Sequence, residues 1–245
     1  MQFCLRGISL ALAGVLSCLL AMPALASEEG DADVLKHPGI SICLQSPKDR
    51  DILQLDLNLT QEELKVISDL VVSETGECAL WLSACRAVLE DVSKDYQQKR
   101  DAITTIPVDE KSAAFLKTAN ANLDQVLSEG QKALLGIWIE EEWKMLTGAP
   151  FAPKAGASSF VEFLKTRMTI PENVARRIRQ DWSYYKTIEL THRQKLRKFP
   201  DLDPQNDISY LRMMRVNVDE KTVQALDDQN RVTYKRIMRS QSLER

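Results

Sequence analysis

Hydrophobic residues recur at steps of three and four along most of the chain from residue 57 onward, and this spacing predicts helices. No long stretch alternates between hydrophobic and polar side chains, and only 9 of the 245 residues are glycine. A strand-rich fold is therefore disfavoured. We expect an all-α fold of about six helices in two units, the first unit being a capped helical hairpin.

Two of the predicted helices begin with a capping box, in which the cap residue and the third residue after it bond to each other's backbone. Thr60 is the first cap, and Glu63 can reach back to it. Ser128 is the second cap, with Gln131 in the returning position. The remaining hydrophobic stripes predict helices over residues 80–103, 110–126, 159–166, 171–198 and 219–239.

A run rich in proline, alanine and serine at residues 148–158 separates two parts of opposite charge. Residues 27–158 hold 13 basic and 23 acidic side chains, whereas residues 159–245 hold 18 basic and 12 acidic ones. We therefore divide the mature chain into an acidic arm at 27–50, a helical domain at 51–147, this linker and a basic helical domain. The charge split suggests that the halves face each other or contact different partners, and two ordinarily charged domains are the simpler alternative.

The first 26 residues are typical of a cleaved secretory signal peptide. Arg6 gives a positive start, a hydrophobic stretch runs from Ile8 to Met22, and Ala24-Leu25-Ala26 matches a cleavage site. The stretch is shorter than the ~20 residues that a membrane span needs. We expect a mature chain from Ser27 that works in the periplasm or outside the cell.

The mature chain keeps three cysteines, and an exported compartment permits disulfides. If Cys78 and Cys85 lay on one continuous helix, they would be ~10 Å apart along its axis, beyond the reach of a disulfide. A bond between them therefore needs a break in the helix, whereas Cys43 could pair with either. With only His37 and His192 and no CxxC or HExxH, the sequence predicts no metal site and no cofactor.

No set of residues in the sequence has the pattern of a catalytic centre, and we predict that the protein is not an enzyme. Glu140, Glu141 and Glu142 are consecutive, so on a helix they do not face one another, and we interpret them as a solvated acidic face. His192 lies close to Glu189 in sequence and could form an acid–base pair, but no nucleophile motif accompanies it.

The predicted helix at 171–198 carries a hydrophobic stripe and many basic side chains on its other faces. These basic side chains could dock on anionic lipid headgroups or on an acidic partner, or they could be solvated. The candidate docking residues are Arg176, Arg177, Arg179, Arg193, Arg197 and Lys198. We expect no nucleic-acid partner for an exported protein.

The two capping boxes resemble the paired LTxxQ motifs of the Spy/CpxP family of small bacterial periplasmic helical proteins. The first reads Leu59-Thr60-Gln61-Glu62-Glu63, and the second reads Leu127-Ser128-Glu129-Gly130-Gln131, 68 residues further on. Glu stands where Gln is usual in the first motif, and Ser replaces Thr in the second. The resemblance covers about residues 51–147 and leaves residues 159–245 without a counterpart, since family members are usually shorter.

This resemblance implies a thin helical cradle, often a homodimer, that binds partly unfolded client proteins or a stress sensor without ATP. Thr60, Glu63, Ser128 and Gln131 would then be structural caps and not client contacts. We therefore expect an ATP-independent chaperone or envelope-stress adaptor. The matched half is strongly acidic, whereas the family's binding surface tends to be basic and apolar. The alternative is a structural envelope component that docks to a membrane or partner assembly through its basic C-terminal helix.

Overall fold

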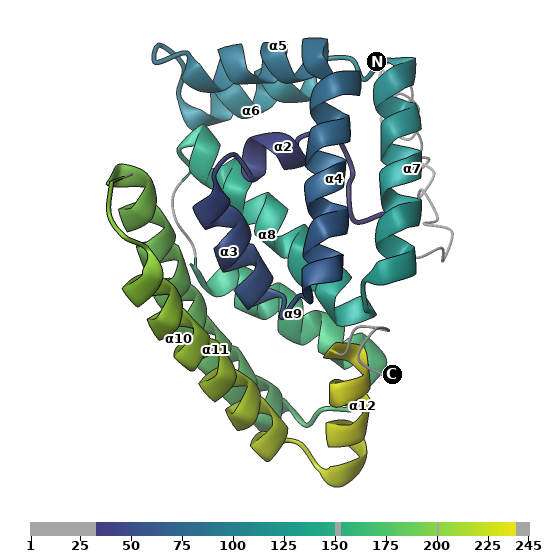
Figure 1. Ribbon diagram of the computed structural model, residues 1–245. Coiled ribbons are helices and arrows are strands. Elements are labelled where there is room, and N and C mark those ends of the chain that lie inside the picture. The colour runs from purple at the N-terminus through teal and green to yellow at the C-terminus, as the bar shows by residue number, and fades with distance from the viewer. Residues whose placement is uncertain (1–32, 150–152, 200, 239–245) are drawn as a thin grey trace, which may run out of the picture. The chain divides into compact units, whose positions relative to one another are not determined.

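A computed structural model of the chain describes residues 33–149, 153–199 and 201–238. Every regular element in these residues is a helix, which confirms the all-α prediction (Figure 1). The predicted signal peptide and its cleavage site lie outside the described residues. No helix within them combines the length and hydrophobicity that a bilayer crossing requires.

The described residues form eleven helices, and the expected count of about six is wrong. Their bounds are α2 Ile40–Cys43, α3 Pro47–Asp56, α4 Gln61–Glu77, α5 Ala79–Glu90, α6 Tyr96–Thr104, α7 Glu110–Val126, α8 Glu129–Thr147, α9 Pro153–Arg167, α10 Glu172–Lys198, α11 Gln205–Ala225 and α12 Asp228–Met238.

Polar side chains that bond to nearby backbone split two of the predicted helices. The predicted helix at 80–103 is two helices, because Asp91 turns the chain by accepting a hydrogen bond from the Ser93 backbone and Asp95 then caps α6. The predicted helix at 219–239 begins earlier, as α11, and breaks after Ala225. Asp227 accepts from the backbone N–H of Asn230 there and starts α12.

Two segments predicted to be irregular contain helix. The acidic arm contains α2 and the start of α3, which Ser46 and Asp49 cap with a third capping box of the same kind. The linker at 148–158 is helical from Pro153 onward, so α9 is longer than expected. Gly148 ends α8 in the left-handed region at φ 77°, which suits a residue without a Cβ.

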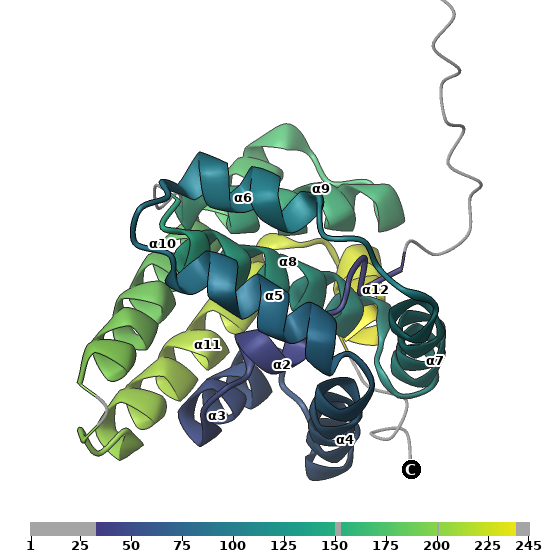
Figure 2. The same cartoon turned by 90° about the horizontal axis from the view of Figure 1, so that it is seen from above.

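The two parts of the chain share one hydrophobic core, so the expected division into two helical units is wrong. The described residues from Val34 to Met238 belong to a single compact unit. Trp138 of α8 and Trp182 of α10 are both fully buried in this core. Seen from above (Figure 2), α8 lies near the middle and contacts α2, α6, α9 and α12. The α10 and α11 helices pack along each other and contact α3 (Figure 1).

Candidate functional site

Both predicted capping boxes are present, with every predicted residue in its capping position. The Thr60 backbone N–H donates to Glu63 Oε2 at 2.8 Å, and Thr60 Oγ1 accepts from the Glu63 N–H at 3.2 Å. In the second box the Ser128 N–H donates to Gln131 Oε1 at 2.8 Å, and Ser128 Oγ accepts from the Gln131 N–H at 3.3 Å. These bonds satisfy N–H groups that the first turns of α4 and α8 leave unpaired.

The two boxes are also bonded to each other. Gln131 Nε2 donates to Glu63 Oε2 at 3.3 Å, and both side chains are buried. This bond ties the start of α4 to the start of α8, across 68 residues of sequence. The sequence motifs predict each cap separately, and only the fold shows that they meet.

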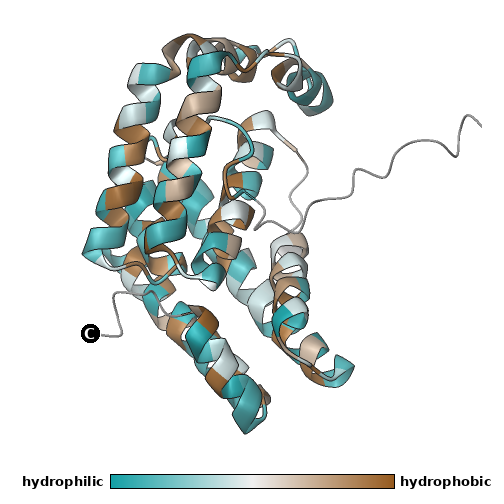
Figure 3. Cartoon of the chain, turned by 90° about the vertical axis from the view of Figure 1, so that its right-hand side faces the viewer, coloured by the Kyte–Doolittle hydropathy of each residue, from teal (hydrophilic) through white to brown (hydrophobic). Residues whose placement is uncertain are grey.

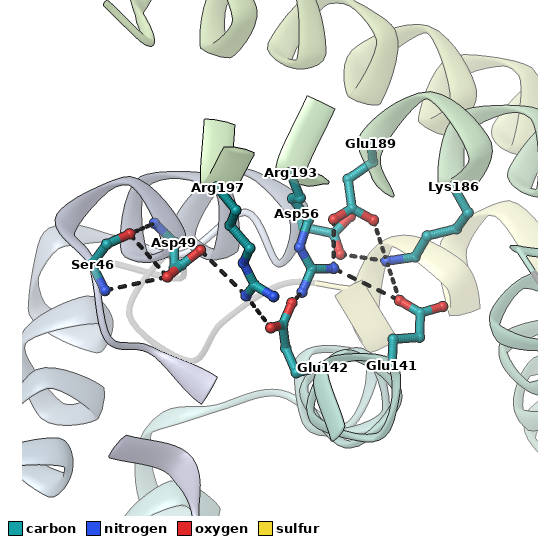
Figure 4. A network of polar contacts seen from close by, with 9 residues as sticks. All are labelled: Ser46, Asp49, Asp56, Glu141, Glu142, Lys186, Glu189, Arg193 and Arg197. Atoms are coloured by element: carbon teal, nitrogen blue, oxygen red, sulfur yellow. Dashed lines mark hydrogen bonds and ion pairs between the residues drawn. The ribbon is translucent and has the colours of Figure 1, made fainter. Parts of the chain in front are cut away.

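A buried ionic network joins α3, α8 and α10 (Figure 4). Its residues are Ser46, Asp49, Asp56, Glu141, Glu142, Lys186, Glu189, Arg193 and Arg197. Lys186 Nζ lies at the centre, 2.7 Å from Asp56 Oδ2, 3.0 Å from Glu189 Oε2 and 3.5 Å from Glu141 Oε2. Buried charges are tolerated only where they are paired in this way.

Two arginines of α10 complete the network toward the start of α3. Arg193 Nη1 donates to Glu189 Oε1 at 2.7 Å, and the same guanidinium pairs with Glu142. Arg197 also pairs with Glu142 and reaches Asp49 Oδ1 at 3.5 Å. The carboxylate of Glu142 on α8 thus pairs with two guanidiniums of α10.

Arg215 of α11 extends the network on the other side of Asp56. Its Nε donates to the Asp56 backbone carbonyl at 2.9 Å, and Nη1 lies 2.7 Å from Asp219 Oδ1. The guanidiniums of Arg215 and Arg193 also stack over core tryptophans, at 4.7 Å from Trp182 and 4.2 Å from Trp138. Such cation–π contacts strengthen when they are desolvated, as here.

The network shifts the pKa values of its members in directions set by burial and by their neighbours. Burial alone would lower the pKa of Lys186, but the attraction of Asp56, Glu141 and Glu189 outweighs it and raises that pKa well above its ordinary value. Burial raises the pKa of Glu189 to about 8, with repulsion from Asp56 and Glu141 adding to it. Attraction by Lys186 opposes this rise, and the two Glu189 oxygens accept from Lys186 and Arg193.

This network corrects two expectations. Glu141 and Glu142 are not a solvated acidic face, because α10 covers this side of α8; only Glu140 is exposed. Arg193 cannot dock on a membrane or partner, because its side chain is fully buried. The acidic and basic parts of the chain meet here through ion pairs, as expected if the two halves face each other.

The other predicted docking residues lie on different parts of α10. Arg176, Arg177 and Lys198 are exposed. Arg179 pairs with Glu162 at 3.0 Å and with Glu172 at 3.8 Å, so its charge is already balanced. The exposed residues at the two ends of α10 are 21 positions apart, or about 32 Å along a helix, and so do not form one patch.

His192 pairs with a residue other than the one suggested by sequence proximity. Its Nδ1 lies 2.6 Å from Asp207 Oδ1, and Lys195 Nζ contacts the same carboxylate. Glu189 is instead bonded to Lys186 and Arg193. The pair lies between α10 and the start of α11, and the Tyr210 ring centroid lies 5.4 Å from that of His192.

Cys43, Cys78 and Cys85 are buried free thiols in the structure. Burial raises the pKa of the Cys85 thiol to about 12 and raises that of Cys43 further. Thiols with such pKa values are poor nucleophiles at neutral pH. Disulfide pairing among the three stays a prediction. No group of three or more potential ligands suited to a metal occurs among the described residues.

An open groove of about 370 Å³ lies between α4 and α7. Figure 3 shows the hydropathy of the chain from the right-hand side of Figure 1, the side on which α7 lies. The floor of the groove is hydrophobic and includes the buried residues Leu70, Phe115 and Ala119. Asp69 and Glu77 are the charged residues that line it. The other lining residues are Val66, Ser73, Thr118, Asn122, Gln125 and Val126. Such a groove can hold an apolar segment, with its carboxylates favouring a segment that carries Lys or Arg.

Comparisons of the chain with protein-family models, with curated proteins and with solved structures gave no significant match.

Proposed function

We propose that the protein is a non-enzymatic protein-binding factor of the periplasm, an ATP-independent chaperone or envelope-stress adaptor that resembles the Spy/CpxP family. The observation that carries this proposal is the open groove between α4 and α7, with its hydrophobic floor and its acidic rim. A shallow surface of mixed character favours weak and reversible binding of many partners.

The bonded capping boxes support the proposal, because they give the two family-like motifs one shared structural role. Glu63 and Gln131 are buried and bonded to each other, so they cannot contact a client directly. They fix the start of α4, which forms one wall of the groove. The motifs would therefore hold the binding surface without being part of it.

The buried ionic network supports a binding role over a catalytic one. Its carboxylates resemble the paired acids of hydrolases, but Asp56, Glu142 and Glu189 are each fully buried. A general acid or base must reach within about 3 Å of its substrate or act through one water. These groups instead form ion pairs with Lys186 and the arginines of α10.

The alternative function, docking of a structural envelope component through the basic C-terminal helix, has a narrower basis. On α10, exposed basic residues lie near both ends, and those without an ion pair there are Arg176, Arg177 and Lys198. Lys195 and Arg197 are also exposed, but they pair with Asp207 and Glu142. If the protein docks in this way, it should bind anionic vesicles at low salt and dissociate from them at high salt.

Aggregation suppression tests the proposed function. The mature chain is mixed with a chemically unfolded model client without ATP, and light scattering is followed. Asn122 is exposed and lines the groove, so Asn122→Trp fills it; Ala121→Trp adds the same side chain at an exposed position next to it that does not line the groove. We expect suppression by the native chain and by Ala121→Trp, and its loss in Asn122→Trp. Failure of the native chain to suppress aggregation contradicts the chaperone function, and equal activity of the two variants contradicts the groove as the contact surface.

A further inference from the structure

A second cavity, of about 510 Å³, lies where α2, α3, α4 and α5 come together. It is separate from the groove between α4 and α7 and from the buried ionic network. Its lining residues are Ser41, Leu44, Gln45, Arg50, Val71, Thr75, Ala79, Leu82, Ser83 and Arg86. Its size falls within the range of small-molecule sites, about 300–1,000 Å³.

The charges of this cavity set it apart from the surface around it. Arg50 of α3 and Arg86 of α5 line it, and no carboxylate does. Within the described residues neither guanidinium forms an ion pair, although this part of the chain holds nearly twice as many acidic as basic side chains. The Nε of Arg50 is buried and has no hydrogen-bond partner. A buried charged donor without a partner costs free energy, and the charge of an anion in the cavity would offset part of that cost.

The nearby carboxylate of Glu74 does not supply that acceptor. Glu74 is fully buried on α4, one residue before Thr75 of the cavity wall. Its two oxygens accept the backbone N–H groups at the start of α2, from Gly39 at 2.5 Å, Ile40 at 3.2 Å and Ser41 at 2.6 Å. These bonds commit the carboxylate to α2 and leave the two arginines unbalanced.

The rest of the wall suits a ligand that is anionic at one end and apolar at the other. Ser41, Ser83 and Gln45 add neutral hydrogen-bonding groups beside the arginines. Leu44, Val71, Ala79 and Leu82 add a hydrophobic surface. Sites for small ligands combine such an apolar wall with a few polar groups that fix orientation.

We propose that this cavity binds a small phosphomonoester, with Arg50 and Arg86 holding the phosphate and the hydrophobic wall covering the organic part. Two unpaired guanidiniums match the charge of a phosphomonoester, which is about −1.5 to −2 at neutral pH, whereas a carboxylate would balance only one of them. Arginine also presents its donors in the planar arrangement that phosphate oxygens accept. This site does not depend on client binding in the α4–α7 groove.

Isothermal titration calorimetry on the full mature chain tests the site, with phenyl phosphate as the probe and benzoate as its singly charged analogue. Arg86→Gln removes an exposed guanidinium, so folding is expected to be unaffected; Arg176→Gln removes an exposed arginine of α10 as the matched control. We expect phenyl phosphate to bind with a Kd below about 1 mM, benzoate to bind at least about tenfold more weakly, and Arg86→Gln to weaken phenyl phosphate about tenfold. Arg176→Gln leaves the affinity unchanged.

A second arm separates a soluble ligand from a lipid headgroup. Vesicles containing phosphatidic acid present the same phosphomonoester on a membrane. If the protein co-sediments with these vesicles, and Arg86→Gln abolishes this binding while Arg176→Gln does not, the lipid is the source of the ligand. Arg50→Gln removes the second cation and should weaken phenyl phosphate in the same way. Its fold is checked by circular dichroism. The proposal is overturned if phenyl phosphate does not bind the native chain, or if Arg86→Gln and Arg176→Gln weaken it equally.

Discussion

Replacing Lys186 with methionine removes the cation at the centre of the buried ionic network. The Nζ atom lies 2.7 Å from Asp56 and 3.0 Å from Glu189, and both carboxylates are completely buried. Methionine occupies a similar volume, so the loss is mainly electrostatic. Asp56 is left without its ion-pair partner, because Arg215 contacts its backbone carbonyl and not its carboxylate.

Removing one partner of a buried ion pair costs about 3–5 kcal/mol, and the geometry around Lys186 places this variant in that range. Urea denaturation followed by tryptophan fluorescence measures the free energy of unfolding. Lys65→Met is the matched control, because Lys65 pairs with Asp69 on the surface, where both side chains are mostly exposed. A second substitution, Asp56→Asn, removes the orphaned charge and should restore part of the lost stability. If Lys186→Met destabilises the protein no more than Lys65→Met, the network does not hold the acidic and basic parts together.

The ionic network, the capping boxes and the buried cysteines give the remaining predictions. Because the pKa of Glu189 is raised to about 8 in the fold, the folded state binds more protons than the unfolded chain between about pH 5 and 8, so stability falls as pH rises through that window. Between pH 6 and pH 8 the free energy of unfolding of the native chain should fall by about 2 kcal/mol, and that of Glu189→Gln should change less. The same change in both proteins would rule out Glu189 as the source of the pH dependence. Thr60→Ala removes a cap and should lower the free energy of unfolding by about 1 kcal/mol. A double-mutant cycle between Glu63 and Gln131 should give a coupling free energy of about 0.5–1.5 kcal/mol. Zero coupling would mean that the two capping boxes are energetically independent. The three buried thiols should react with a thiol reagent only after unfolding, and fewer than three reactive thiols in the unfolded, unreduced chain would show a disulfide.

Local signals predicted the caps of α4 and α8, because a capping box is decided within four residues. The pattern Ser46 to Asp49 carries the same signal as the two boxes that were identified, with Pro47 in the first helical position, and it could have revealed α3. The turn at Asp91 to Asp95 could also have been read from its Asp and Ser residues.

The buried ionic network could not be located from sequence, because its members come from three helices far apart along the chain. Glu141 and Glu142 sit in a triplet that is typical of a solvated face, and α8 has no clear polar side because several helices surround it. The feature of the sequence that bears on this network is the charge split between the two parts of the chain. That split indicates attraction between them but not which residues meet. The bond between Glu63 and Gln131 is hidden for the same reason.

Hydrogen exchange of residues 27–245, measured with and without an unfolded client, tests the central claim most directly. If the groove between α4 and α7 captures clients, amides of α4 and α7 should gain protection on mixing, while those of α10 and α11 should not change. Protection confined to α10, or no change in any helix while a client is demonstrably bound, would contradict the proposed binding surface.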